Sequence, residues 1–129
     1  MTTAASSDEG KFGQYDAALP DITDDAMLSL LGTVRPYTVV VLTKTDRYDP
    51  ETAKPIIWEH GRRNMALRAA GRLVVVCPVS DGTPLSGIGI FAGTPEEVAA
   101  TMEADPAVLA GIFTYAVHPS RSFPGDALP

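Results

Sequence analysis

The chain has 129 residues, of which 45% are hydrophobic and 20% charged, a composition that predicts one folded globular domain with a real core. No basic stretch indicates nucleic-acid binding, and no apolar run reaches the length of a membrane span. The first residues lack the basic and apolar parts of a signal peptide, and the single cysteine, Cys77, allows no disulfide within the chain. We therefore expect a cytoplasmic protein.

The net charge of −6 is unevenly distributed. Residues 1–33 hold six of the sixteen acidic residues and only one basic residue, whereas the remainder is nearly balanced. Residues 1–20 are polar and rich in Gly, Ser and Asp, so we expect a mobile or loosely wrapped arm there. The sequence thus predicts an acidic N-terminal arm over 1–33 and one domain over 34–129.

A short helix is expected within the arm, over Asp21–Leu31. Thr23 or Asp24 can cap its start, acidic residues occupy its first turn, and Gly32 ends it.

Two helices are expected in the domain. The first covers Ile56–Gly71, with Pro55 at its first position, where the missing N–H costs nothing, and Gly71 at its C-terminal cap. The second begins at Thr94-Pro95-Glu96-Glu97, a capping box with proline at the first helical position, and is broken at Asp105-Pro106.

Four strands flank these helices. Each is short, apolar and rich in β-branched or aromatic residues, and they cover Tyr37–Thr43, Leu73–Cys77, Gly87–Ala92 and Ile112–Val117. Gly87–Gly93 superficially resembles a dinucleotide-binding loop, but the spacing is wrong and the glycines lie inside a strand. From His118 onward, the prolines predict the absence of regular structure.

The order β-α-β-β-α-β predicts a ferredoxin-like α+β sandwich, in which an antiparallel four-stranded sheet carries both helices on one face. Several strands are apolar on both faces, as in Val39–Leu42 and Leu73–Val76. Because the helices cover only one face, a second cover is needed, and a homodimer packed through the open sheet faces is the simplest one. The alternative cover is the N-terminal segment.

The helix Ile56–Gly71 places a histidine among its apolar residues. At roughly 100° per residue, His60 and Asn64 fall in the same arc as Ile56, Ile57 and Leu67, and no charged residue falls there. Both side chains are therefore expected to point toward the sheet. His60 is then either a core histidine satisfied by backbone or a general acid or base in a pocket between helix and sheet.

Asp105 is the candidate partner of His60. An aspartate before a proline is typical of a helix N-cap, so Asp105 can also serve only to begin a short turn. The two roles are compatible, because one carboxylate oxygen can cap while the other orients an imidazole.

Between Tyr37 and Val117 the chain resembles the YCII-related proteins, small dimeric α/β-barrel proteins with a ferredoxin-like fold. The resemblance rests on Glu59-His60, on Ala70-Gly71-Arg72-Leu73, and on the capping box leading to Ala104-Asp105-Pro106. It implies that His60 is the acid or base and Asp105 its orienting partner. The N-terminal arm, the segment Cys77–Asp81 and the C-terminal tail depart from the family pattern.

Other side chains are candidates for substrate contacts. Arg63 or Asn64 can hold a polar group of a substrate, Ser86 can lie at the pocket mouth or simply in a turn, and Tyr115 can face the pocket, the dimer or the core. The two histidines and the cysteine lie on separate elements, which argues against a metal site, and no nucleotide-binding loop is present. We expect neither metal nor cofactor.

Two functions remain open from the sequence. One is a cofactor-independent small-molecule enzyme, a lyase, isomerase or dehydrochlorinase-like protein, in which His60 and Asp105 transfer a proton on an aromatic or enol-like compound. The other is a non-catalytic ligand-binding or accessory dimer. The distance between His60 and Asp105, and the presence of a cavity beside them, discriminate the two.

Overall fold

The computed structural model of the chain describes residues 16–129. The first half of the expected acidic arm, residues 1–15, lies outside the described residues. The described residues divide into two compact units, one formed by residues 36–121 and the other by residues 16–35 together with residues 122–129.

The smaller unit contains α1 (Asp24–Leu31). Its N-cap is Thr23, whose hydroxyl accepts the Ala26 N–H at 3.1 Å, and Gly32 is its C-cap. The helix predicted here therefore exists, although it begins at Asp24 rather than at Asp21. None of its residues is buried.

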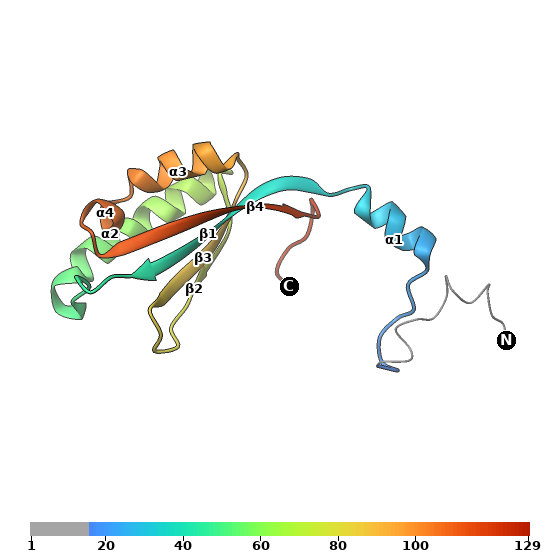
Figure 1. Cartoon of the computed structure of the whole chain (residues 1–129), viewed down its shortest axis with the longest axis horizontal. Helices are drawn as coiled ribbons and strands as arrows, with labels where there is room; N and C mark the ends of the chain where they lie inside the picture. The colour runs from blue at the N-terminus through green and yellow to red at the C-terminus, as the bar shows by residue number, and fades with distance from the viewer. Residues whose placement is uncertain (1–15) are drawn as a thin grey trace. The chain divides into compact units, whose positions relative to one another are not determined.

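The larger unit is an α+β structure built on one four-stranded sheet in the order β2-β3-β1-β4. The strands are β1 (Arg35–Lys44), β2 (Leu73–Pro78), β3 (Leu85–Phe91) and β4 (Phe113–Ser122). β3 pairs antiparallel with both β1 and β2. The helices lie together on one face of the sheet (Figure 1), so the α+β class and the open antiparallel sheet are confirmed.

The last strand is longer than its sequence indicated. β4 continues through His118 and Pro119 to Ser122, so the prediction of no regular structure after Val117 is wrong. β4 lies at the edge of the sheet beside β1 only. A proline without an N–H is tolerated on an edge strand, because one side of that strand has no neighbour to bond.

The long helix α2 (Pro50–Ala69) also begins earlier than predicted. Asp49 is its N-cap and accepts the Glu51 N–H at 3.0 Å, so Pro50, not Pro55, is the first helical residue. Pro55 lies inside the helix, where its ring nitrogen cannot donate to the carbonyl four residues earlier. A local capping signal at Asp49-Pro50 thus outweighs the cost of an internal proline.

The C-terminal end of α2 follows its prediction. Gly71, just beyond the C-cap Ala70, has a φ of 74°, and the Arg72 N–H donates to the Leu67 carbonyl at 2.9 Å. This is the left-handed helix ending that favours glycine.

Two shorter helices complete the layer. α3 (Pro95–Glu103) begins with the predicted capping box, in which Thr94 and Glu97 each accept the other's backbone N–H. α4 (Pro106–Leu109) follows at once, with Asp105 as its N-cap. Only Ala104 and Asp105 separate α3 from α4.

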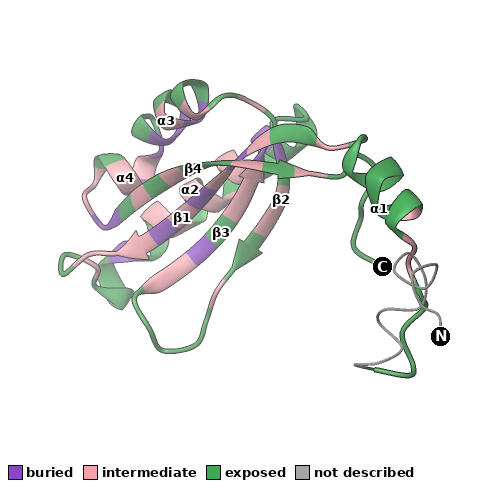
Figure 2. Ribbon diagram, turned by 45° about the vertical axis from the view of Figure 1, so that its right-hand side comes forward, coloured by how far each residue is buried: buried purple, intermediate pink, exposed green. Residues whose placement is uncertain are grey.

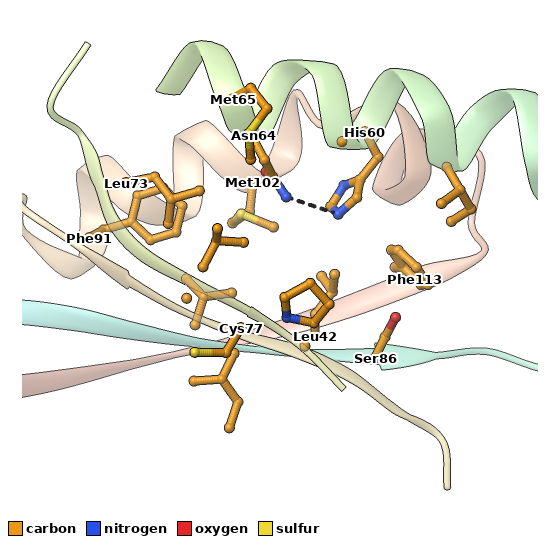
Figure 3. A pocket seen from close by; sticks show the side chains of 18 residues that line it. Leu42, His60, Asn64, Met65, Leu73, Cys77, Ser86, Phe91, Met102 and Phe113 are labelled. Carbon is orange, nitrogen blue, oxygen red and sulfur yellow. Dashed lines mark hydrogen bonds between the residues drawn. The ribbon is translucent and has the colours of Figure 1, made fainter. Parts of the chain in front are cut away.

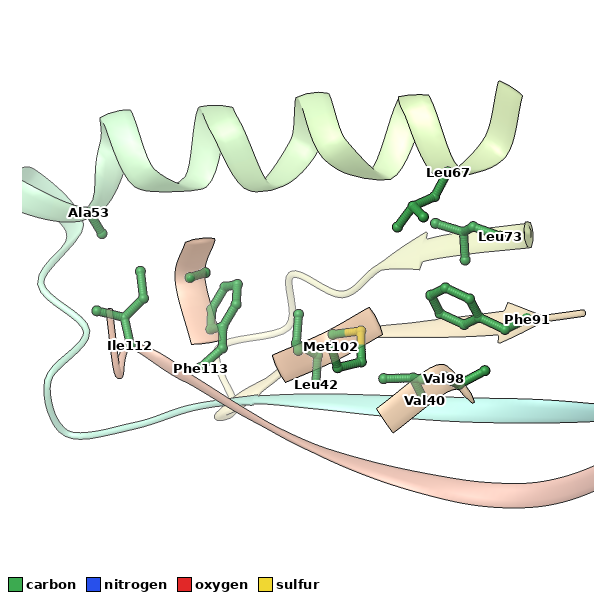
Figure 4. Packing of buried hydrophobic residues seen from close by; sticks show 11 residues of the cluster. Val40, Leu42, Ala53, Leu67, Leu73, Phe91, Val98, Met102, Ile112 and Phe113 are labelled. Atoms are coloured by element: carbon green, nitrogen blue, oxygen red, sulfur yellow. The ribbon is translucent and has the colours of Figure 1, made fainter. Parts of the chain in front are cut away.

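The hydrophobic core lies between the sheet and the helices (Figure 4). On β1, Val40 and Leu42 are buried while their neighbours are only half-buried, so the strand alternates between its two faces. The purple bands in Figure 2 follow this alternation on β1. Leu67 of α2 and Met102 of α3 close the core from the helix side.

Gly61 within α2 and Gly71 just beyond its end give opposite expectations for stability. A Cβ added at Gly71 meets no atom within 4 Å, but the φ of 74° is strained for any other residue. We expect Gly71→Ala to lower the free energy of unfolding by about 1 to 2 kcal/mol.

Gly61 is the matched control, because a Cβ there also meets nothing within 4 Å while the backbone is helical. We expect Gly61→Ala to raise the free energy of unfolding by up to about 1 kcal/mol. Urea unfolding of both variants measures the difference, and a loss of stability in Gly61→Ala would contradict the open space beside that residue.

Candidate active site

His60 lies near the middle of α2 and points toward the sheet, as its place in the apolar arc predicted. Its side chain is only 12% exposed. The ring stands edge-on to Phe113 of β4, with 5.3 Å between ring centroids and an interplanar angle of 78°. Phe113 therefore packs against the imidazole with its ring nearly perpendicular to it.

Asp105 meets His60 from a position 45 residues further along the chain. Its Oδ1 lies 2.8 Å from His60 Nδ1, and its side chain is 1% exposed. Its Oδ2 accepts the backbone N–H groups of Ala107 at 2.9 Å and Val108 at 3.3 Å. One carboxylate thus caps α4 and orients the imidazole at the same time.

Asn64, one turn beyond His60, occupies the other ring nitrogen. Its Nδ2 lies 3.2 Å from His60 Nε2, the contact drawn as a dashed line in Figure 3. A carboxylate only accepts hydrogen bonds, so Nδ1 carries the proton toward Asp105 and Nε2 presents its lone pair. The Asn64 amide then donates to that lone pair, and the neutral imidazole is held in one tautomer.

Burial and hydrogen bonding act in opposite directions on Asp105. Burial, the largest single influence, raises the pKa of the carboxyl group, because the charged form leaves water. The hydrogen bond and the charge attraction from His60, together with the two N–H groups of α4, outweigh it and lower the pKa of Asp105 below its ordinary value. The site therefore holds Asp105 as a carboxylate.

Arg63, three residues after His60 on α2, also lies near Asp105. Its Nη1 is 3.8 Å from Asp105 Oδ1, too far for a hydrogen bond but close enough for attraction. Among the described residues, this nitrogen is the buried side-chain donor that has no hydrogen-bond partner. Arg63 was predicted to hold a substrate group, but in the structure it faces Asp105 and does not line the neighbouring cavity.

A partly open cavity of about 280 Å³ adjoins His60 between α2 and the sheet (Figure 3). Its polar side chains are His60, Asn64 and Ser86, and most of its remaining wall is apolar. Its lining residues are Val40, Leu42, Ile57, His60, Gly61, Asn64, Met65, Leu73, Val76, Cys77, Pro78, Ser86, Gly87, Ile88, Gly89, Phe91, Met102 and Phe113.

The glycines of β3 help to create this space. Gly89 pairs with Val40 and Gly87 with Leu42, both buried toward the helices, so the two glycines share that face. A Cβ at Gly89 would lie 3.2 Å from Leu73 Cδ1 and 3.3 Å from Phe91 Cε1. Leu73 and Phe91 therefore pack closely against the bare strand at Gly89, and both glycines line the cavity.

The remaining predicted residues separate into two groups. Ser86 lines the cavity, at the β3 end that the sequence placed at the pocket mouth. Tyr115 does not line it. Its hydroxyl donates to the Ala99 carbonyl of α3 at 3.3 Å, and a hydrogen bond to Glu103 raises the pKa of the Tyr115 phenol.

Several apolar residues of the cavity wall were not predicted from the sequence to line a pocket. Met65 and Met102 lie on two different helices, and Phe113 forms the wall behind the imidazole. On α2, Met65 falls at about 180° from Ile56, outside the arc that contains His60. The cavity wall therefore extends beyond the single helix face that the sequence indicated.

Over residues 16–129, no cluster of three or more His, Cys, Asp or Glu side chains is suited to a metal ion. Within the same residues, no helix combines the length and the apolar character that crossing a membrane requires.

Comparison with known proteins gives no match, either to a family model or to a curated protein. The resemblance to the YCII-related proteins therefore stays a prediction.

The lowered pKa of Asp105 predicts a specific pH dependence. A carboxylate whose folded pKa lies below its unfolded value of about 3.9 stabilises the fold above that pH, and this contribution is lost as the pH falls through the folded value. In Asp105→Asn the cap can persist, because asparagine also caps well, but the charged hydrogen bond to His60 is lost. We expect the free energy of unfolding at pH 7 to fall by about 1 to 3 kcal/mol.

The measurement is urea unfolding of wild type and Asp105→Asn from pH 7 to pH 3. The difference between the two should shrink below about pH 4, as Asp105 is protonated in the wild type. The lowered pKa values of Asp81 and Glu97 contribute equally to both proteins and cancel in the difference. A difference independent of pH would show that the carboxylate charge does not stabilise the fold.

Proposed function

We propose that the protein is a cofactor-independent small-molecule enzyme in which His60 and Asp105 transfer a proton on an aromatic or enol-like substrate. The observation that carries this proposal is the 2.8 Å contact between His60 Nδ1 and Asp105 Oδ1, directly beside a cavity that His60 itself lines. A buried dyad of this kind, next to space for a ligand, is typical of general acid–base sites.

His60, Asp105 and Asn64 each have a separate role in this proton transfer. Nε2 of His60 accepts a proton from the substrate, while Nδ1–H keeps its hydrogen bond to the Asp105 carboxylate, whose charge stabilises the imidazolium. The Asn64 amide, 3.2 Å from Nε2, is placed to donate to the oxygen that loses the proton. Lyase, isomerase and dehydrochlorinase-like reactions can begin with such a proton transfer, in which the oxyanion that forms is held by a hydrogen bond.

The sheet order β2-β3-β1-β4 supports the finer assignment of fold and family. In this order each helical connection skips one strand, as in the ferredoxin-like sandwich, and the resemblance of Tyr37–Val117 to YCII-related proteins implies the same arrangement. We therefore propose a ferredoxin-like fold of the YCII-related, dimeric α/β-barrel kind. We also propose that the protein is cytoplasmic.

One observation favours the alternative, a non-catalytic ligand-binding or accessory protein. Both ring nitrogens of His60 already have partners within the protein, as a purely structural histidine would. The cavity and the charged partner weigh against this reading, since a core histidine needs neither.

Turnover of hydroxylated and chlorinated aromatic compounds tests the proposal. We expect His60→Ala to lower kcat by about 10² to 10⁴-fold, the range that general acid–base catalysis supplies. Asp105→Asn should also lower kcat strongly, because the amide group would favour a proton on Nε2 and leave no acceptor facing the cavity.

Arg63→Met is the matched control for charge around Asp105, since Arg63 does not line the cavity. Its kcat should stay within about one order of magnitude of wild type, as expected of a residue outside hydrogen-bond reach of the site. Undiminished turnover in both His60→Ala and Asp105→Asn would rule out the proposed roles and leave the accessory-protein alternative.

The proposal includes a homodimer packed through the open sheet face. Val39 pairs with Ile90 and Val41 with Ile88, and these side chains lie on the face opposite the buried Val40 and Leu42. Ile88 is 38% exposed. Four large apolar side chains in adjacent register form a patch that a second copy can cover.

Sedimentation velocity tests the dimer. We expect wild type to sediment as a dimer and Val41→Lys to sediment as a monomer, because a lysine at the centre of the patch would be buried without a partner. Leu109→Lys is the control, since Leu109 of α4 is 72% exposed on the helix layer and should leave the dimer intact. A monomeric wild type would exclude the face-to-face dimer.

A further inference from the structure

We propose that the cavity beside His60 takes an uncharged ligand of one ring that carries an acidic hydroxyl group, a phenol or an enol, and that it discriminates against carboxylates and phosphates. This inference rests on the proposed function, in which His60 is the base. It adds the charge, the size and the reacting group of the ligand.

The charge follows from the cavity wall. None of the 18 lining residues is an aspartate, glutamate, lysine or arginine. Arg63 has its Nη1 3.8 Å from Asp105 Oδ1 and lies outside the wall. An anionic ligand would leave water without meeting an opposite charge, which is costly.

The buried carboxylate strengthens this preference. Asp105 stands directly behind the imidazole, so its negative charge disfavours a second anion on the cavity side of His60. A neutral ligand avoids this problem. When the hydroxyl proton of the ligand moves to Nε2, the ligand oxygen becomes an anion and His60 becomes an imidazolium. The two new charges therefore arise as a pair.

The size follows from the volume of about 280 Å³. A dry cavity of about 150 Å³ already holds benzene, whereas drug-sized ligands occupy pockets of about 300 to 1,000 Å³. One ring with small substituents therefore fits. The walls that would contact it, Leu73, Phe91 and Met102, are apolar and buried.

The polar end of the cavity indicates that the ligand carries a hydroxyl group. His60 Nε2 is an acceptor and Asn64 Nδ2 a donor, and they lie 3.2 Å apart on neighbouring turns of α2 (Figure 3). A ligand hydroxyl entering between them donates to Nε2 and accepts from Nδ2, so it replaces the bond that it breaks. A ligand without a hydroxyl cannot make this exchange.

A second hollow on the same helix must be told apart from the cavity in any binding experiment. A more open groove on the outer side of α2 is lined by Tyr48, Lys54, Trp58 and Arg62, among others. It contains the cations that the cavity lacks, and Trp58, the only tryptophan of the chain, is 70% exposed there. Any binding experiment must therefore locate the ligand as well as measure its affinity.

Nuclear magnetic resonance of the full chain does both. The probes are 4-methylphenol, 4-methylbenzoate and toluene at pH 7, which share a ring and a methyl group and differ only in the polar group. Shifts of the Asn64 side-chain amide and of the Gly87 and Gly89 backbone amides report the cavity. Shifts of the Trp58 indole N–H report the outer groove.

We expect 4-methylphenol to shift the cavity signals with a Kd at least about 10-fold below that of either other probe, because only it replaces the hydrogen bond without bringing a charge. Equal cavity affinity for 4-methylbenzoate would overturn the charge preference, and equal affinity for toluene would overturn the hydroxyl requirement. The absence of cavity shifts with all three probes would overturn the proposal.

A cation introduced into the wall provides a second test. Ser86→Arg should strengthen cavity binding of 4-methylbenzoate by about 10-fold, because the charge then has a partner. Ser80→Arg, at an exposed loop position outside the cavity, is the control and should change nothing. Met65→Lys serves the same purpose if Ser86→Arg does not fold, and unchanged affinity in a folded variant would contradict the proposal.

The binding measurements test the ligand class, and the turnover measurements test the proposed function, so the two can fail separately. Selective binding of 4-methylphenol with no turnover of any aromatic compound would retain the ligand class and remove the enzyme. Turnover of a carboxylated substrate that depends on His60 would retain the enzyme and remove the ligand class.

Discussion

The hydrogen bond between His60 Nδ1 and Asp105 Oδ1 connects the parts of the structure on which the site depends. It joins the middle of α2 to the junction of α3 and α4, across 45 residues of sequence. The same carboxylate donates no proton and has no access to water, so its second oxygen must also be satisfied, and the N–H groups of α4 do this. Removal of either partner therefore leaves a buried polar group unpaired.

Much of the frame around this bond was predictable because its causes are local. The capping box at Thr94, the left-handed glycine at Gly71 and the angular position of His60 on α2 depend on residues within a few positions of one another. The contact with Asp105 was different, because no spacing rule predicts a meeting between residues so far apart. It was expected only from the family resemblance, and the distance of 2.8 Å agrees with that expectation.

The errors arose where two local signals competed or where tertiary position decided. Pro50 and Pro55 both suit a helix start, and the capping side chain of Asp49 decided between them. Pro119 disfavours a strand in general, but not on the edge where β4 lies. Arg63 is a different case, because it lies about 20° outside the arc that contains His60 and its Nη1 is 3.8 Å from Asp105 Oδ1, outside the cavity wall.

The strand β3 shows how one short sequence serves two surfaces. In Gly87-Ile88-Gly89-Ile90 the glycines face the helices, where the missing side chains leave room beside His60, and the isoleucines face the opposite side of the sheet. A shift of β3 by one residue would turn the isoleucines toward the helices and the glycines toward the open face. The isoleucine side chains would then fill the cavity, and the open face would lose its apolar side chains. The register of β3 therefore determines both the space for a ligand and the apolar surface behind it, and the pairing of Val40 with Gly89 fixes that register.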